Sequence, residues 1–360
     1  MPFSETIIAE AVDRYDRERD RYIKLAGRVA DLCRAIVDDN AVRAQVTFRT
    51  KTVKSFEGKL RRFAKRPDKN YASVDEVFAE VGDFAGVRVA TYRPEDEQRV
   101  AEAIAALFCG PGAISVDIDR KDKLNPASGQ FYRATHCQVH LPPTELIGNY
   151  ENLRGASCEI QVCSMMAHVW NEIEHDIGYK PEGEGPSEAE RGLLETLGHL
   201  ARAGDAAITR LLAANTARMT AQTGDFTDVH DFVARLRPRL PDADLSVNAG
   251  PAFDAAQVLG LTSLEQLEAA TQGHAIDHAW GADRIGQFNA HVEENGRSEL
   301  GLNSGSADLV LVALLDRYAE QIVKRLSEAG VQSRPGRLMV LARAYQEFLA
   351  GAASPGQFAG

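Results

Sequence analysis

The sequence predicts an α/β or α+β region followed by a mainly α-helical one. Between residues 44 and 163, segments that alternate apolar and polar residues lie between segments with a helical period. After residue 223 only the helical period recurs. Because single cores seldom exceed about 250 residues, a chain of 360 residues is long enough for two domains. We expect these domains to be 1–222 and 223–360.

The first region begins with a helix and continues with strands and helices. Apolar residues at nearly helical spacing predict one amphipathic helix over residues 5–38. A capping-box pair, Ser73 and Glu76, predicts the start of a short helix over 74–81. Helices are also expected at 54–66, 94–108, 164–177 and 189–221, and strands at 44–50, 86–92, 114–120, 134–141 and 156–162.

The second region carries no motif that points to a reaction. Helical patterns cover residues 229–240, 253–261, 263–270, 307–330 and 337–350, and no segment alternates convincingly. Such a domain could drive homo-oligomerisation, cover a site on the first domain or bind a partner. The sequence leaves these three roles open.

Composition excludes several classes of protein. The net charge of −11 argues against a protein that coats nucleic acid by bulk charge. No stretch reaches the roughly 18 apolar residues that a membrane helix needs, and no signal peptide is evident, so we expect a cytoplasmic protein. The five cysteines show no CxxC spacing and are expected to be reduced and mostly buried.

Positive charge is concentrated in one stretch of the first region. Residues 43–69 hold ten basic side chains, opposed only by Glu57 and Asp68. These are Arg43, Arg49, Lys51, Lys54, Lys59, Arg61, Arg62, Lys65, Arg66 and Lys69. We expect an anionic ligand to bind there.

Two acidic residues at predicted strands are candidate ligands of a divalent cation. Asp83 stands at the head of the strand that follows the basic helix, and Glu159 shares a strand face with Gln161. Magnesium prefers one or two carboxylates together with phosphate oxygens. The alternatives are that Asp83 caps a turn and that Glu159 lies on a solvated sheet face.

An aromatic residue near a basic loop is a candidate base-binding group. Tyr132 and His136 are four residues apart, and Lys121 and Lys123 precede them. An exposed tyrosine can stack on a nucleobase, although a buried tyrosine is the commoner case. The pair Glu174 and His175, near the end of the helix over 164–177, is weaker evidence, since adjacent charges are often a surface pair.

Four segments in this order resemble the synthetase domain of RelA/SpoT family alarmone synthetases. They are RTKTVKSFEGKL, DFAGVRV, FYRATH and EIQVCSMMAHVWNEIEHDIGYK, which lie between Gln45 and Lys180. The resemblance implies an α+β fold, with a mixed β-sheet flanked by helices and related to nucleotidyltransferases. It also implies Mg²⁺-dependent transfer of the β,γ-pyrophosphate of ATP to the 3′-hydroxyl of GDP or GTP. The chain resembles the short, synthetase-only members.

The same resemblance implies roles for individual residues. Arg49, Lys51, Ser55 and Lys59 match the positions that hold ATP. Asp83 matches the magnesium ligand, and Glu159 matches the carboxylate that helps to bind the metal or activates the attacking hydroxyl. Tyr132 matches the tyrosine that stacks on the acceptor guanine, with His136 as its companion, and we expect Lys121, Lys123 and Gln161 to line the same side. Arg88 either stabilises the charge that develops on transfer or makes a buried ion pair beneath the site.

The sequence departs from the family pattern at two places, of which the first removes a cationic contact and the second leaves the acceptor open. Cys163 stands where the family usually has arginine, and Gly129 does not directly precede Tyr132. One alternative is a toxic small synthetase that modifies the 3′ end of tRNA or makes adenosine alarmones, with an antitoxin-like partner. The basic residues 61–69 could receive an RNA backbone. Another alternative is an inactive nucleotide sensor.

Overall fold

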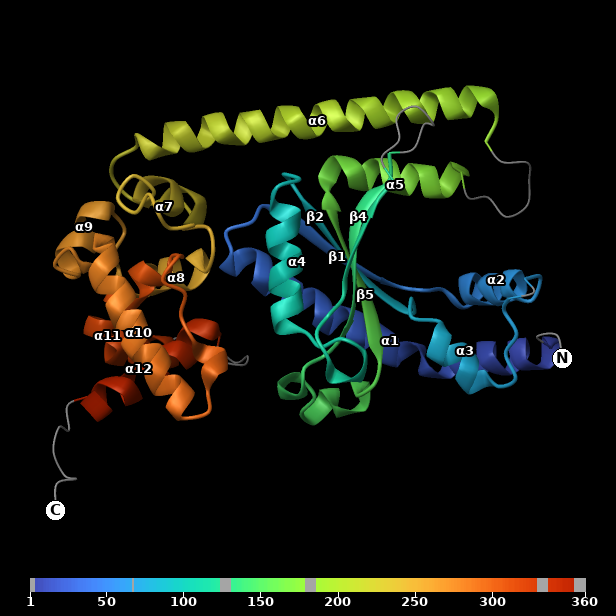
Figure 1. Cartoon of the computed structure of the whole chain (residues 1–360), viewed down its shortest axis with the longest axis horizontal. Coiled ribbons are helices and arrows are strands. Elements are labelled where there is room, and N and C mark those ends of the chain that lie inside the picture. The colour runs from blue at the N-terminus through green and yellow to red at the C-terminus, as the bar shows by residue number, and fades with distance from the viewer. Residues whose placement is uncertain (1–3, 67, 124–130, 179–185, 329–335, 353–360) are drawn as a thin grey trace, which may run out of the picture. The chain divides into compact units, whose positions relative to one another are not determined.

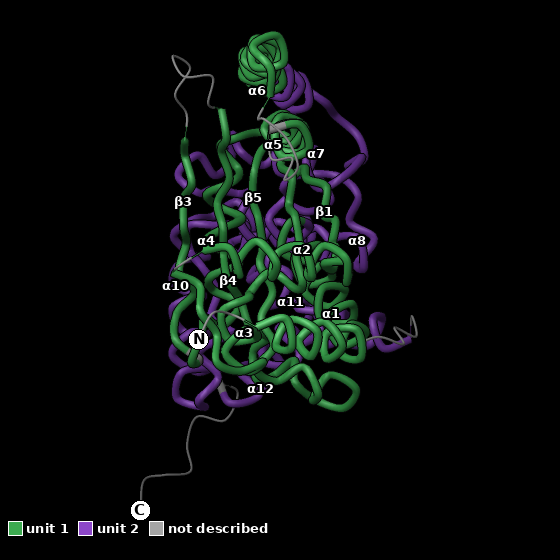
Figure 2. Tube along the Cα trace, turned by 90° about the vertical axis from the view of Figure 1, so that its right-hand side faces the viewer, with its two compact units in different colours: residues 1–37, 43–209 green, residues 38–42, 210–360 purple. Residues whose placement is uncertain are grey.

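The computed structural model describes residues 4–66, 68–123, 131–178, 186–328 and 336–352. The chain forms two compact units, one of residues 1–37 and 43–209 and the other of residues 38–42 and 210–360. Figure 2 colours the two units separately. The boundary between them falls between Thr209 and Arg210, inside a helix. The expected domain boundary, after residue 222, stays a prediction.

The first unit is built on a five-stranded mixed sheet, which confirms the expected α+β fold with a mixed sheet flanked by helices (Figure 1). Its strand order is β1-β2-β5-β4-β3, and only β2 and β5 run parallel. The strands are β1 (Ala44–Thr50), β2 (Ala85–Thr91), β3 (Ile118–Asp122), β4 (Arg133–His140) and β5 (Ser157–Ser164). The helices are α1 (Glu5–Asp39), α2 (Val53–Phe63), α3 (Val74–Glu80), α4 (Asp96–Leu107), α5 (Met165–Gly178) and α6 (Glu188–Thr220).

One strand begins later than its pattern predicts. The alternation from Ile114 predicts a strand over 114–120, whereas β3 begins at Ile118. Ile114 lies instead in a turn, in which the backbone N–H of Gly110 donates to its carbonyl oxygen, and its side chain is exposed. A Cβ at Gly110 would lie 2.4 Å from the carbonyl oxygen of Ser115, so the close approach in this turn requires glycine.

The sheet has one apolar face, which forms part of the core. Val87, Val89, Cys137, Ile160 and Val162 point to this face and are at most 2% exposed. The helices α1 and α4 cover it. Four of the five cysteines are buried, as expected.

The opposite face of the sheet is polar and carries the candidate site. Strand register aligns Arg49 of β1 with Gly86 of β2, and Gly86 with Glu159 of β5. Two residues further along, Arg88 is aligned with Gln161. Because side chains alternate along a strand, the polar residues of four neighbouring strands share this face.

The helix α5 closes one end of the polar face, and α6 runs alongside α5 (Figure 1). Ala167 of α5 packs on Ala134 and Cys163, which stand on the polar side of β4 and β5. Trp170 anchors α5 to α6, since its indole N–H donates to the carbonyl oxygen of Leu194 at 3.0 Å. Cys163 is therefore part of a small apolar cluster under α5, in the position where the family usually has arginine.

The second unit is helical in its described residues, as predicted. Its helices are α7 (Val229–Leu236), α8 (Ala249–Leu259), α9 (Leu264–Ala270), α10 (His278–Glu294), α11 (Asp308–Glu328) and α12 (Arg337–Ala352). The eight residues from Asp308 to Leu315 are all buried, so the first half of α11 is the centre of this core. The sequence did not predict α10, because two glycines interrupt its apolar pattern. Gly281 packs against Leu309, whose Cδ2 would lie 2.8 Å from a Cβ at that position.

The last residues of α1 belong to the helical unit. A Cβ at Gly250 would lie 2.8 Å from the Cα of Asp39, so the first turn of α8 packs directly against the backbone there. Burial raises the pKa of Asp39 to about 6, and Asp254, Asp38 and Asp308 add to the shift while Arg337 opposes it. The ionised carboxylate of Asp39 is therefore unfavourable in the fold.

Replacing Asp39 with asparagine should stabilise this unit at neutral pH. A pKa raised by folding contributes stability that is fully present below about pH 4 and is lost as the pH rises through about 6. At pH 7.5 we therefore expect Asp39→Asn to raise the free energy of unfolding by about 1–2 kcal/mol after solvent screening. At pH 4.5 most of this increase should be absent. Thermal unfolding at both pH values measures it. Exposed Asp242→Asn is the control, and an equal gain at both pH values would contradict the assignment.

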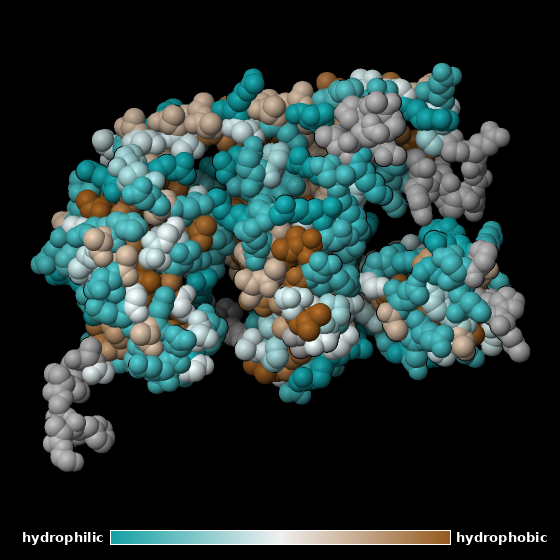
Figure 3. Space-filling view, viewed as in Figure 1, coloured by the Kyte–Doolittle hydropathy of each residue, from teal (hydrophilic) through white to brown (hydrophobic). Residues whose placement is uncertain are grey.

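No helix among the described residues combines the length and the apolar character needed to cross a membrane. On the face shown in Figure 3, hydrophobic residues form small groups that hydrophilic residues separate.

Candidate functional site

The basic stretch places two lysines on Asp83. Lys51 follows β1 and Lys59 lies in α2, whose N-terminus is capped by the side chain of Thr52. The ammonium group of Lys51 lies 2.8 Å from Oδ2 of Asp83, and that of Lys59 lies 2.8 Å from Oδ1. Burial opposes the ionisation of Asp83, but the two lysines outweigh it and lower its pKa. The result is an ionised carboxylate with two cations at the head of β2.

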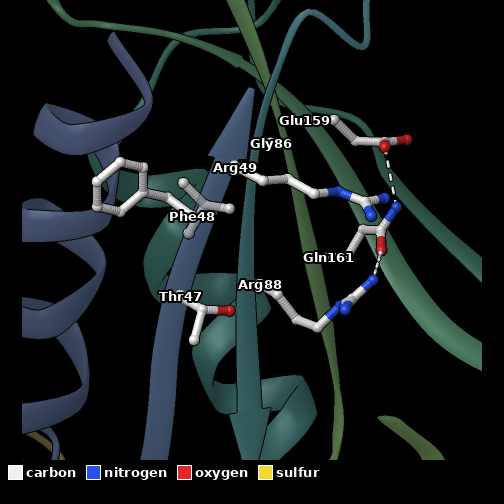
Figure 4. Close-up of a pocket in the computed structure, with 8 residues that line it drawn as sticks. Thr47, Phe48, Arg49, Gly86, Arg88, Glu159 and Gln161 are labelled. Atoms are coloured by element: carbon white, nitrogen blue, oxygen red, sulfur yellow. Dashed lines mark hydrogen bonds between the residues drawn. The ribbon is translucent and has the colours of Figure 1, made fainter. Parts of the chain in front are cut away.

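The other two predicted ATP-binding residues lie nearby in the chain and are exposed. Ser55 is in the first turn of α2, where its backbone N–H donates to Oγ1 of Thr52 at 3.1 Å and its hydroxyl is exposed. Arg49 is at the end of β1, and its guanidinium extends over the polar face of the sheet (Figure 4). Neither side chain makes an ion pair within the described part of the chain.

A hollow lies on the polar face between Arg49 and Arg88 (Figure 4). Its lining includes Gly86, Glu159 and Gln161. The volume of the hollow, including the part open to solvent, is about 340 Å³. Gly86 leaves its centre free of a side chain. Two guanidinium groups therefore flank an open space above the middle of β2.

Glu159 is held by two neighbours on the same face. Its Oε1 lies 2.9 Å from Nδ1 of His136, and its Oε2 accepts from the amide of Gln161 at 2.9 Å. Burial opposes the ionisation of Glu159, whereas His136, Gln161 and Lys121 favour it, and the net effect lowers its pKa. The carboxylate lies on the sheet face, and 26% of the Glu159 side chain is exposed.

Tyr132 is linked to Glu159 through the histidine. Its hydroxyl lies 2.8 Å from Nε2 of His136, and a ring that carries its proton on Nδ1 can accept from Tyr132 and donate to Glu159. The tyrosine ring packs on the apolar cluster beneath α5. Lys123 lies 5.7 Å from the ring centroid, and Lys121 lies 3.3 Å from Nδ1 of His136. Four of the predicted acceptor-side residues, Tyr132, His136, Lys121 and Lys123, therefore gather on one side of Glu159. The fifth, Gln161, lines the hollow instead and contacts Arg88.

Arg88 makes an ion pair, which was one of its two predicted roles. Its Nη2 lies 2.7 Å from Oε1 of Glu172 on α5 and donates to Oε1 of Gln161 at 3.2 Å. The ion pair is not wholly buried, because 44% of the Glu172 side chain is exposed. Arg88 also lines the hollow, so the ion pair does not remove it from the site.

The donor chemistry of Asp83 and Glu159 fits a hard divalent cation. Both carboxylates are ionised, and each lies near positively charged or N–H donor groups that phosphate oxygens could share. Among the described residues, no three or more His, Cys, Asp or Glu side chains are arranged to hold a metal by themselves. A magnesium ion needs only one or two carboxylates when phosphates supply the remaining ligands.

Two residues near the site were not predicted from the sequence. Gln138 on β4 donates to the carbonyl oxygen of Gly82 at 3.0 Å and so fixes the turn that presents Asp83. Glu172 pairs with Arg88, whereas the sequence had drawn attention to Glu174 and His175. No local pattern distinguishes Glu172, since its partner is 84 residues away. Gly129, Tyr179 and Lys180 lie outside the described residues.

The comparison with protein families finds a match in the part of the chain that carries this site. Residues 48–184 match the model described as "Region found in RelA / SpoT proteins". The chain contains a RelA/SpoT region. This region begins in β1, ends just after α5 and includes Arg49, Asp83, Tyr132 and Glu159. The resemblance read from the four sequence segments is confirmed, and the match covers less than half of the chain.

Solved structures similar to this chain cover a little more than half of it. Small alarmone synthetase 1 from Bacillus subtilis is 21% identical, with 57% of this chain and 99% of that one covered and a TM-score of 0.42. The same protein bound to its product pppGpp is 22% identical, with 56% and 97% covered and a TM-score of 0.42. A GTP pyrophosphokinase family protein from Streptococcus pneumoniae is 23% identical, with 55% and 92% covered and a TM-score of 0.41. The comparison with curated proteins finds no match. What the comparisons show is therefore a RelA/SpoT region over residues 48–184.

Proposed function

We propose that the chain transfers the β,γ-pyrophosphate of ATP to the 3′-hydroxyl of GDP or GTP. The observation that carries the proposal is the polar face of the sheet within the RelA/SpoT region. There, two lysines converge on an ionised Asp83, and an ionised Glu159 is fixed between His136 and Gln161. Transfer of a phosphoryl-type group needs charge neutralisation and a positioned nucleophile, and these two clusters supply them.

The lysine cluster is the proposed phosphate side of the site. Lys51 and Lys59 would exchange part of their contact with Asp83 for the phosphates of ATP. Asp83, with Glu159, would hold Mg²⁺, which neutralises charge on phosphate oxygens. Arg49 and Arg88 would flank the rest of the nucleotide in the hollow, since a planar guanidinium stacks on flat rings.

Glu159 is the proposed base. The 3′-oxygen of the acceptor attacks the β-phosphorus of ATP, and the bond from that phosphorus to the oxygen shared with the α-phosphate breaks, so AMP leaves. The proton of the hydroxyl passes to the carboxylate of Glu159. The contacts from His136 and Gln161 hold the carboxylate in one orientation, which lowers the cost of reaching the transition state.

Tyr132 and its neighbours are the proposed acceptor side. The Tyr132 ring would stack on the guanine, and Lys121 and Lys123 would attract the acceptor phosphates. His136 joins this side to Glu159, so binding of the base and activation of the hydroxyl involve adjacent groups.

The basic residues beyond the site favour a small nucleotide over tRNA. Within 61–69, Arg61 pairs with Glu57 and Glu5, Arg66 pairs with Asp68, and Lys69 pairs with Glu80. Cations that already have carboxylate partners offer less to an RNA backbone. tRNA and adenosine nucleotides remain the second candidates. A homo-oligomer, an antitoxin-like partner and the role of the helical unit stay predictions.

A labelled-donor experiment tests the proposal. The protein is incubated with γ-labelled ATP, magnesium and, in parallel, GDP, GTP, AMP, ADP and deacylated tRNA, and the products are separated. Label on a guanosine nucleotide is the expected result. Label on tRNA or an adenosine nucleotide would show that this molecule is the acceptor in place of GDP or GTP. If no acceptor is labelled but ATP still binds, the nucleotide sensor is favoured.

Replacing Arg49 with alanine should weaken ATP binding more than it slows transfer. The Arg49 side chain forms one wall of the hollow and makes no ion pair or hydrogen bond with Glu159. We expect KM for ATP to rise about tenfold and kcat to fall less than about threefold. Steady-state kinetics at fixed acceptor concentration measure both. The exposed residue Arg62 serves as the control in Arg62→Ala, and a loss confined to kcat would contradict this role for Arg49.

A further inference from the structure

Arg88 and Arg49 form opposite walls of the hollow but are held differently. The Arg88 side chain is 16% exposed, and its Nη2 contacts both Glu172 and Gln161. The Arg49 side chain is exposed and makes no hydrogen bond or ion pair with the described residues. A long arginine side chain loses much rotamer freedom when it is fixed. Arg88 has therefore lost this rotamer freedom before a nucleotide binds, whereas Arg49 would lose it on binding.

Both contacts of Arg88 use the same nitrogen. Nη2 lies 2.7 Å from the Glu172 carboxylate and 3.2 Å from the Gln161 amide oxygen. Among the described residues, no hydrogen bond or ion pair uses Nη1 or Nε of Arg88. Gln161 also donates to Glu159. Arg88 is thus fixed by one contact from α5 and by one from the strand that carries the proposed base.

The surroundings of Glu172 support an ionised partner for Arg88. Burial raises the pKa of Glu172, but Arg88 and, more weakly, Arg49 and His168 outweigh burial and lower it. His168 lies one turn earlier on α5, and burial, aided by Arg88, lowers its pKa. His168 is thus a poor competitor for the carboxylate at neutral pH.

We propose that Glu172 is a positioning residue of the donor-nucleotide site, which holds the Arg88 guanidinium as a preformed wall of the hollow. This inference rests on the proposed function for the identity of the nucleotide. Glu172 acts through Arg88, because its contact is with Nη2 of that arginine and it does not line the hollow. A preformed wall raises affinity by reducing the ordering that binding requires.

A double-mutant cycle tests the inference through binding alone. The probe is the ATP analogue AMPCPP with magnesium, and its binding to the full chain is measured by calorimetric titration. Arg88→Lys keeps the charge but lacks the planar guanidinium, and we expect it to weaken binding about tenfold. Glu172→Ala releases Arg88 and should weaken binding about fivefold. In the double variant the two losses should not multiply, and binding should match Arg88→Lys within about twofold.

Two further variants separate positioning from damage to the fold. Glu172→Gln keeps an acceptor oxygen for Nη2 without the charge, so its loss should be smaller than that of Glu172→Ala. Asp176→Asn changes a carboxylate on the same helix that is 84% exposed, and it should bind AMPCPP as the unaltered chain does. Thermal unfolding of every variant reports on the fold.

The outcomes distinguish this inference from the proposed function. Unchanged binding in Glu172→Ala, no loss in Arg88→Lys, or losses that multiply in the double variant would each overturn the inference. If the unaltered chain binds AMPCPP and the cycle behaves as expected, but no acceptor is labelled, the proposed reaction fails and the role of Glu172 stands. If the unaltered chain does not bind AMPCPP, the donor site itself is refuted, and Glu172 loses its role with it.

Discussion

Asp83→Asn should reduce pyrophosphate transfer by about 10³-fold and leave ATP binding largely intact. The carboxylate of Asp83 is ionised, and the ammonium groups of Lys51 and Lys59 lie 2.8 Å from it. Asparagine removes the charge that would hold a divalent cation but leaves both lysines to bind phosphate. The loss should therefore appear in kcat, with KM for ATP unchanged or lower.

Steady-state kinetics across a range of magnesium concentrations check this prediction. The variant should not recover at high magnesium, since its ligand is missing rather than weakened. Asp75→Asn is the matched control, because Asp75 is 88% exposed and pairs with Arg14 at the surface. Turnover within tenfold of the unaltered chain would remove Asp83 from the proposed metal site.

Glu159→Gln should reduce transfer by about 10²–10⁴-fold, the range for a lost general base. The amide has the same shape as the carboxylate, and its oxygen can still accept from Nδ1 of His136, which lies 2.9 Å from the carboxylate. The variant should therefore keep the sheet and the positions of its neighbours. It loses the hydrogen bond from the Gln161 amide, because its own NH2 group cannot accept one. It also loses the ability to take up the proton of the attacking hydroxyl and the charge that would face a metal.

Single-turnover measurements at saturating ATP and acceptor isolate the chemical step. Both nucleotides should bind Glu159→Gln with nearly unaltered affinity, which separates a loss of chemistry from a loss of binding. Glu102→Gln on α4 is the control, since Glu102 is exposed and remote from the polar face. A rate close to that of the unaltered chain would show that another group accepts the proton.

The sequence by itself determined the local features of this protein. Alternation placed Glu159 and Gln161 on one face of a strand, and Ser73 with Glu76 located the start of α3. The order of the four motifs identified the RelA/SpoT region. These features depend on spacing along the chain, because side chains alternate between the two faces of a strand and a helix cap forms between residues three apart.

Only the tertiary structure decided which of these residues meet. The strand order β1-β2-β5-β4-β3 brings Arg49, Gly86 and Glu159 into one row, although they come from three separate segments. The ion pair of Arg88 with Glu172 joins β2 to α5, and α10 forms although glycines weaken its pattern. Strand neighbours, register and helix packing are set by contacts between distant parts of the chain. The spacing of residues within one segment therefore does not predict them.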